Sequence, residues 1–126
     1  MSQLLSIEKR NAVLNRMAIL LEQERANIKS VNQQDLDSYS GGDLAMEKRL
    51  LVDDAKIDGM ILSLQQLASQ EDPVGQIRFD FTHENGLKIY NKMAAFGTIL
   101  IIYESRPDVT VEAGGIAFKS GNKILL

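Results

Sequence analysis

The sequence contains no cysteine, and its only histidine is His83. Disulfide bonds, thiolate metal sites and cysteine nucleophiles are therefore excluded within this chain. The histidine lies beside Asn85-Gly86 and has no evident catalytic partner near it in the sequence. We therefore expect an exposed hairpin residue rather than a general acid or base.

Long apolar runs and an excess of basic residues are also missing. No apolar stretch reaches the roughly 18 to 20 residues of a membrane-spanning helix, and residues 1–10 are polar, unlike a secretory signal. The formal net charge of −3 disfavours binding to nucleic acid or to anionic membranes. With 44% hydrophobic and 25% charged residues, the composition is typical of a soluble globular protein, and we expect a cytoplasmic one.

The first half of the chain predicts helices, because apolar residues recur there at helical spacing. The clearest helix follows Asp53, a suitable N-cap, and stops before Asp72-Pro73, since proline disfavours helical geometry in the residue before it. Residues 38–43 contain Gly41-Gly42 and predict a loop. We interpret the apolar stripes as core packing. They comprise Val13, Leu14, Met17, Ala18 and Leu21; Ile28, Val31 and Leu36; and Ile57, Met60, Ile61, Leu64, Leu67 and Ala68.

After Gly75 the apolar period changes to two. Ile77, Phe79 and Phe81 alternate with polar residues, which predicts a half-buried strand. Asn85-Gly86 predicts a two-residue turn, because both central positions of that turn favour positive φ. We therefore expect an antiparallel β-hairpin over residues 76–93.

An incomplete βαβ unit is expected next. Residues 98–103 form a continuous apolar, β-branched run, typical of a parallel strand covered on both faces. Arg106-Pro107 favours a helix start, Gly121 is placed to end that helix, and residues 123–126 begin another strand. One such unit leaves strand edges and a sheet face uncovered, so we expect further sheet from additional sequence or from a partner chain. The inner face of the helix would carry Val109, Ala113, Ile116 and Ala117.

Residues 103–110 are the strongest candidate for chemistry, because they join the carboxyl end of a predicted strand to the amino end of a predicted helix. Ligands of α/β proteins gather at that edge. The helix start offers N–H groups to an anion, and Arg106 could clamp a phosphate or carboxylate. The alternative is that Glu104 pairs with Arg106, and that Ser105 or Asp108 only caps the helix. The residues alone leave both interpretations open.

Two other features have mainly structural interpretations. Gly114-Gly115 within a predicted helix costs about 1 kcal/mol per glycine relative to alanine. Tight helix–sheet packing explains that cost better than ligand approach, and the pattern matches neither a dinucleotide fingerprint nor a P-loop. The acidic pairs Asp53-Asp54 and Glu71-Asp72 have no companion ligands, so we interpret them as caps and solvated ends and expect no metal.

Residues 101–110 (IIYESRPDVT) resemble the γ-glutamyl phosphate reductases, also called glutamate-5-semialdehyde dehydrogenases. Asp72-Pro73-Val74-Gly75 and residues 119–126 (KSGNKILL) agree, as do residues 49–52 and Gly86-Leu87, so the resemblance covers essentially the whole chain. It implies an aldehyde-dehydrogenase-like α/β fold. Residues 1–126 would form the amino-terminal part of its cofactor-binding domain, and residues 76–93 a protruding hairpin of oligomerisation type.

The same resemblance implies an oxidoreductase of proline biosynthesis, a homo-oligomer that uses NADPH to reduce γ-glutamyl phosphate to glutamate-5-semialdehyde. A cysteine thiolate would displace phosphate, and hydride from the nicotinamide would reduce the resulting thioester. Glu104, Ser105 and Arg106 would lie near substrate and nicotinamide. No catalytic residue is expected in this chain, because it lacks the cysteine, and Ala95 replaces a proline usual in the family. We therefore expect neither an intact NADP site nor activity from these residues alone.

A second hypothesis, from a different class, is a non-catalytic interaction module that recruits a partner or another copy by strand addition at the exposed sheet edge. A third is a small anion-binding domain built around Arg106 and the helix start.

Overall fold

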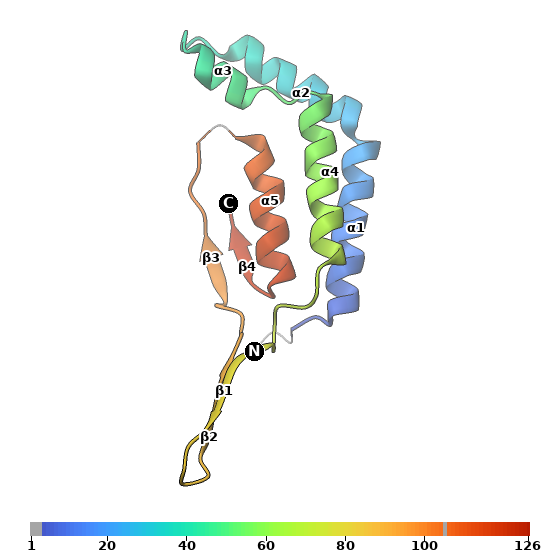
Figure 1. The fold of residues 1–126 in the computed structure, drawn as a ribbon. Coiled ribbons are helices and arrows are strands. Elements are labelled where there is room, and N and C mark those ends of the chain that lie inside the picture. The colour runs from blue at the N-terminus through green and yellow to red at the C-terminus, as the bar shows by residue number, and fades with distance from the viewer. Residues whose placement is uncertain (1–3, 105) are drawn as a thin grey trace.

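The structure, a computed structural model, describes residues 4–104 and 106–126. It has the α/β fold that the sequence predicts: helices first, then a hairpin, then a strand–helix–strand unit (Figure 1). The helices are α1 (Ile7–Gln23), α2 (Arg25–Ser38), α3 (Leu44–Leu50), α4 (Asp54–Ser69) and α5 (Pro107–Lys119). The strands are β1 (Ile77–Thr82), β2 (Lys88–Lys92), β3 (Thr98–Leu100) and β4 (Lys123–Leu125).

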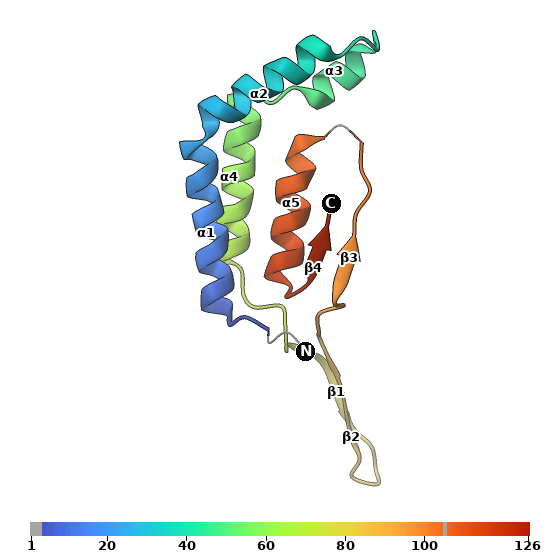
Figure 2. The same cartoon turned by 180° about the vertical axis from the view of Figure 1, so that it is seen from behind.

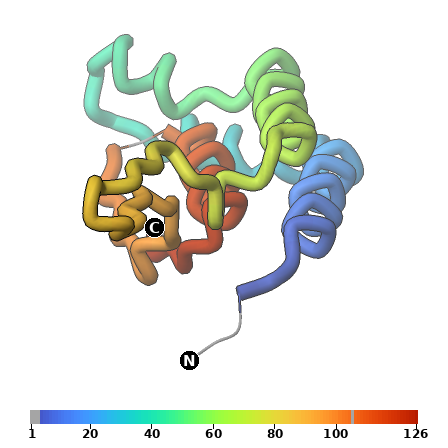
Figure 3. Tube along the Cα trace, turned by 60° about the horizontal axis from the view of Figure 1, so that its bottom comes forward, coloured from blue at the N-terminus to red at the C-terminus, as the bar shows by residue number. Residues whose placement is uncertain are grey.

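The core lies between α1, α4 and α5. Figures 2 and 3 show α5 between the α1–α4 pair on one side and the two short strands β3 and β4 on the other. Leu14 of α1 and Leu64 of α4 are completely buried and belong to one apolar cluster. The stripe predicted for α4 is confirmed at its buried positions, Ile57, Met60, Leu64 and Ala68.

Two predicted core residues lie outside this core. Val13, on α1, is 39% exposed, because the buried side of that helix runs through Arg10, Leu14 and Ala18 at intervals of four residues. Val31, on α2, is 50% exposed, whereas the next residue, Asn32, is the buried one. On α5, the expected inner residue Ile116 is 57% exposed. The sequence stripes thus located these helices and the buried face of α4, but they misassigned part of the buried faces of α1, α2 and α5.

Local signals explain where several elements begin and end. Asp53 accepts a 2.8 Å hydrogen bond from the Lys56 N–H and caps α4, as predicted. Gly121 has φ +77°, and the N–H groups of Gly121 and Asn122 donate to Phe118 and Ala117, which is the glycine stop expected for α5. The helix α3 was not expected; the predicted loop ends at its N-cap, Asp43.

The hairpin forms, but it differs from its prediction in burial and in its turn. All residues from 77 to 92 are exposed, so the predicted half-buried strand is wrong: no described element covers its apolar face. The turn is closed by a 2.8 Å bond from the Gly86 N–H to the His83 carbonyl, and His83 N–H donates to the Leu87 carbonyl. The connection between His83 and Leu87 therefore has three residues rather than two, and its last residue, Gly86, has φ +86° in the left-handed region.

The strands β3 and β4 pair in parallel, as a βαβ unit requires. The strand predicted over residues 98–103 is nevertheless too long, and so is the one over residues 123–126. The last backbone hydrogen bond between the two strands runs from the Ile101 N–H to the Leu125 carbonyl. Leu100 is 65% and Ile102 is 88% exposed, which agrees with the uncovered sheet face expected of a single unit of this kind.

Gly115 is where α5 approaches α1 and α4 most closely. A Cβ added there would lie 3.0 Å from Leu67 Cδ1 and 3.1 Å from Leu64 Cδ2. At Gly114 the nearest such atom, Leu126 Cδ1, is 4.0 Å away. Tight packing is therefore present at Gly115, but against the helices α1 and α4 rather than against a sheet as predicted, and it is not present at Gly114.

We expect Gly115→Ala to reduce the free energy of unfolding, because overpacking costs about 1–3 kcal/mol and exceeds the helix-propensity gain of about 1 kcal/mol. Gly114→Ala is the matched control and should stabilise by up to about 1 kcal/mol. Urea denaturation followed by circular dichroism measures both. Equal stability of the two variants would contradict the packing described for α5.

Candidate functional site

The sequence-predicted site lies on the turn between β3 and α5. Glu104 and Arg106 are exposed there, and Arg106 is the N-cap residue of α5. Ser105, the third predicted site residue, lies outside the described residues. The expected strand-to-helix geometry is present, so the turn is positioned as anion sites of α/β proteins are.

Arg106 points its charge at Asp108 rather than at Glu104. The Arg106 Nη2 atom is 3.7 Å from Asp108 Oδ2, whereas no pair between Arg106 and Glu104 occurs among the described residues. The Arg106 side chain is 56% exposed, so this long contact leaves most of the guanidinium open to a ligand. The alternative of a Glu104–Arg106 pair is therefore wrong in this geometry.

Asp108 does not cap α5 as the sequence allowed. It lies one residue after Pro107, inside the first turn, and the N-cap position makes no side-chain hydrogen bond. Its Oδ1 atom is buried and finds no hydrogen-bond partner within residues 4–104 and 106–126. A carboxylate in the first turn interacts favourably with the helix dipole, and that of Asp108 also lies beside the Arg106 guanidinium.

The two ends of the turn are held together by their hydroxyl groups. Tyr103 Oη and Thr110 Oγ1 form a hydrogen bond across the turn. This bond joins the connection that follows β3 to the first turn of α5, and Glu104 and Arg106 lie between its two residues in the sequence. The sequence reading included both residues in the segment but assigned them no contact.

The other residues considered from the sequence have structural roles. His83 is exposed on the hairpin, as expected; its Nδ1 accepts a 3.3 Å bond from the Asn85 N–H. Asp54 bridges α4 to α2 by accepting from Arg25 and Lys29, at 3.2 and 2.6 Å. The hydrogen bonds from Lys29 and Arg25 hold the pKa of Asp54 below its usual value. In the described part of the chain, no group of three histidine or acidic side chains could hold a metal ion.

One hollow among the described residues lies away from the candidate turn. Its volume is about 760 Å³, and its lining includes Leu5, Arg10, Val74, Gly97 and Asn122. It therefore sits at the amino end of β3 and the base of the hairpin, opposite the Glu104–Arg106 end. Its lining combines apolar residues with the polar side chains of Arg10, Asn122 and Lys123.

Arg10 beside this hollow belongs to a buried polar cluster that the sequence reading missed. Arg10 and Lys119 are 2% and 3% exposed, and Arg10 Nη2 lies 2.5 Å from Asp72 Oδ2. One sequence signal was available: Arg10 occupies the same four-residue register as Leu14 and Ala18. A charged residue on an apolar stripe indicates either exposure or a buried partner.

Within the described residues, none of the helices combines the length and the apolar character that crossing a membrane requires.

Comparison with known proteins identifies similar chains. No protein-family model matches the sequence. A γ-glutamyl phosphate reductase of Hydrogenobaculum sp. is 41% identical over 119 residues, which are 93% of this chain and 27% of that protein. One of Neisseria meningitidis is 42% identical over 120 residues, 94% of this chain and 29% of that protein.

Two solved structures agree with these sequence matches. The crystal structure of γ-glutamyl phosphate reductase from Thermotoga maritima matches 97% of this chain and 30% of its own, with a TM-score of 0.87 and 35% identity. The Saccharomyces cerevisiae enzyme has a TM-score of 0.87 and 31% identity, over 94% of this chain and 31% of its own. The chain thus spans about 30% of the length of the relatives it matches.

Proposed function

We propose that this chain, a relative of the γ-glutamyl phosphate reductases over nearly its whole length, is the amino-terminal part of an oxidoreductase that reduces γ-glutamyl phosphate to glutamate-5-semialdehyde for proline biosynthesis. The observation that carries the proposal is Arg106, 56% exposed at the start of α5 and at the carboxyl side of β3. Sequence similarity supports the family, and this turn supplies a group suited to its substrate.

The substrate of that reaction carries an acyl phosphate, an α-carboxylate and an α-ammonium group. In our proposal the Arg106 guanidinium, which offers a planar fork of N–H donors, binds one of the two anionic groups. The exposed carboxylate of Glu104 on the same turn suits the ammonium group. The hydroxyl pair Tyr103–Thr110 keeps both residues at the sheet edge.

The reductant that the resemblance implies, NADPH, supplies a hydride when bound. The described turn does not fit the cofactor's phosphates by itself, because Arg106 is its one cationic side chain and in our proposal it binds the substrate. We propose only that Glu104, Ser105 and Arg106 lie near the nicotinamide. The thiolate nucleophile would come from outside these 126 residues, which include no cysteine.

The isolated 126-residue polypeptide should accordingly be inactive. The reverse reaction offers a direct assay, in which glutamate-5-semialdehyde, phosphate and NADP⁺ give γ-glutamyl phosphate, NADPH and a proton. We expect no NADPH formation above the rate without protein. Turnover by the purified chain, proportional to its concentration, would contradict the proposal that the nucleophile lies elsewhere.

We further propose that the hairpin contacts a second copy of the protein. Phe79, Phe81 and Ile89 lie on one face by the strand register and are 61%, 49% and 48% exposed. An isolated two-stranded hairpin is only marginally stable in water, so covering this face by a partner is favourable. The opposite face carries Tyr90, paired with Asp80.

Phe81→Ser should weaken self-association by about tenfold or more, because a buried interface aromatic typically contributes more than 1 kcal/mol. Light scattering after size exclusion, over a concentration series, measures the change. The matched control is Tyr90→Ser, which removes a 59% exposed aromatic from the other face. A wild-type chain that stays monomeric throughout the series, or equal effects of both variants, would contradict a hairpin interface.

The alternative function, a non-catalytic interaction module, is favoured by the exposed apolar side chains along β3 and β4. Leu100 and Leu125, a register pair, are 65% and 58% exposed. In that case strand addition would occur at this sheet rather than at the hairpin. A charged substitution at Leu100 that abolishes self-association, with Phe81→Ser lacking any effect, would favour the module.

A further inference from the structure

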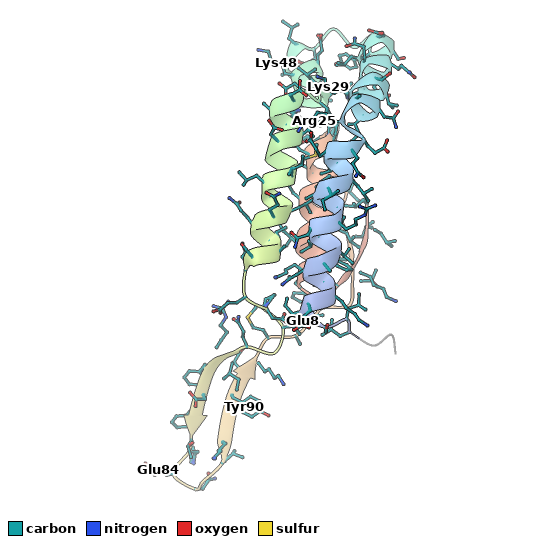
Figure 4. All side chains as sticks on the ribbon, turned by 90° about the vertical axis from the view of Figure 1, so that its right-hand side faces the viewer. Glu8, Arg25, Lys29, Lys48, Glu84 and Tyr90 are labelled. Atoms are coloured by element: carbon teal, nitrogen blue, oxygen red, sulfur yellow. The ribbon has the colours of Figure 1, made fainter. Side chains whose placement is uncertain are left out.

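The β1–β2 hairpin forms an arm that extends away from the helices, which together form the helical layer. Figures 1 and 2 show β1 and β2 extending beyond the ends of the helices, and Figure 4 places Glu84 at the far tip. No residue from 77 to 92 is buried. Contacts along the arm therefore do not set its direction, which must be determined where it joins the helical layer.

Asp72 organises the entry to the arm. Its Oδ1 atom accepts a 2.9 Å bond from the Val74 N–H, and its backbone carbonyl accepts a 2.7 Å bond from Gln76 Nε2. The arm is closed just beyond, where Gly75 N–H donates to the Met93 carbonyl and Met93 N–H to the Gln76 carbonyl, at 2.8 and 2.9 Å. The base of the hairpin is thus a hydrogen-bonded unit that includes Asp72.

The second carboxylate oxygen of Asp72 faces the helical layer. There it accepts a 2.5 Å bond from Nη2 of Arg10, a residue of α1 that is 2% exposed. The same guanidinium donates through Nε to the Leu5 carbonyl at 3.1 Å and through Nη1 to the carbonyl of Lys119, the last residue of α5. One buried side chain therefore connects the segment before α1, the end of α5 and the base of the arm.

Lys119 fixes the helical side of this junction. Its Nζ donates to Asn11 Oδ1 and to the Gln70 carbonyl, both at 2.7 Å, and so joins α5 to α1 and to the end of α4. Burial lowers the pKa of Lys119. Burial alone would raise the pKa of Asp72, but hydrogen bonds from Arg10 and Val74 and the charges of Arg10 and Lys119 hold it below its usual value. Asp72 is therefore anionic where Arg10 meets it.

We propose that the Arg10–Asp72 ion pair is a lock that sets the direction of the hairpin relative to the helical layer. One carboxylate oxygen of Asp72 accepts the hydrogen bond from Val74 at the base of the hairpin, and the other accepts the bond from Arg10 in the helical layer. Buried ion pairs contribute little net stability compared with apolar residues, but they can specify one geometry. Opening the pair frees the arm to swing as a unit, while its own ladder and the apolar core stay intact. This inference does not depend on the proposed enzymatic function.

The test is a distance measurement between the arm and the body. Because the chain has no cysteine, cysteines introduced at Glu84 and at the exposed Gln65 of α4 can carry two spin labels without background. Labelled protein is diluted with excess unlabelled chain, so that only distances within one molecule are detected. We expect one narrow distance distribution for the otherwise unchanged protein.

Asp72→Asn should broaden that distribution. The amide oxygen can still accept from the Val74 N–H, but a neutral amide replaces the carboxylate that faces Arg10. Arg10→Lys provides an independent variant, because it keeps the charge and loses the fork that reaches three segments. It should broaden the distribution as well, and it carries the test if Asp72→Asn does not fold.

The control is Asp58→Asn, which removes an ion pair to Arg25 in the helical layer, far from the arm. It should leave the distribution unchanged. Circular dichroism and a label pair at Asn15 and Gln65, both within the helical layer, verify that each variant is folded. An unchanged distribution in folded Asp72→Asn or Arg10→Lys, or equal broadening in Asp58→Asn, would overturn the proposed lock.

Discussion

Replacing Arg106 by alanine should lower kcat/KM for γ-glutamyl phosphate by about 10- to 100-fold, because a hydrogen bond to a charged group contributes about 1.5–3 kcal/mol. The substitution is made in a chimera, in which this chain replaces the corresponding segment of the Thermotoga maritima reductase. The two segments share 35% identity and superpose with a TM-score of 0.87, so we expect the replacement to preserve the fold. NADPH oxidation measures the rate.

Arg16→Ala is the matched control, since it removes an exposed arginine from α1, away from the turn. It should retain the activity of the unsubstituted chimera. Arg106→Lys separates charge from geometry and should recover part of the loss, because lysine keeps the charge without the planar fork. Full activity of the Arg106→Ala chimera would remove Arg106 from the site.

Leu64→Ala should reduce the free energy of unfolding by about 2–5 kcal/mol, the range for a buried leucine whose site cannot collapse. Leu64 is 0% exposed, lies in one cluster with Leu14 and Ala18 of α1, and approaches Gly115 of α5. It therefore contacts all three helices of the core. A loss of this size is a large part of the stability of a small domain.

The control for Leu64→Ala is Leu62→Ala, two positions along the same helix and 53% exposed. It should change the free energy of unfolding by no more than about 0.5 kcal/mol. Urea denaturation followed by circular dichroism gives both values. Similar losses for the two variants would show that the core is not organised around Leu64.

Those parts of the fold that depend on local physics could be predicted from the sequence. The cap Asp53 and the stop at Gly121 act within one helical turn, so their residues alone locate the ends of α4 and α5. The alternation from Ile77 to Phe81 located β1 for the same reason. What such patterns cannot give is the neighbour that covers an apolar face, and this is why the burial expected for β1 was wrong.

The candidate site and the buried polar cluster differ in the same way in how far the sequence predicts them. The position of Glu104 and Arg106 between a strand and a helix was predictable, because that follows from local order along the chain. The Arg10 cluster was not, because its partners are 62 and 109 residues away in the sequence. Asp72 illustrates the limit: beside Pro73 it was interpreted as a helix end, and its partner in α1 emerges only from tertiary packing.

The activity of the unsubstituted chimera tests the central claim most directly, namely that this chain supplies the amino-terminal, substrate-side part of a γ-glutamyl phosphate reductase. The chimera is purified and its fold and oligomeric state are matched to the parent Thermotoga maritima enzyme before assay. The account predicts NADPH-dependent reduction of γ-glutamyl phosphate by the chimera, whereas the isolated 126-residue chain gives none. A chimera that is folded and assembled like the parent enzyme but has no turnover would contradict it.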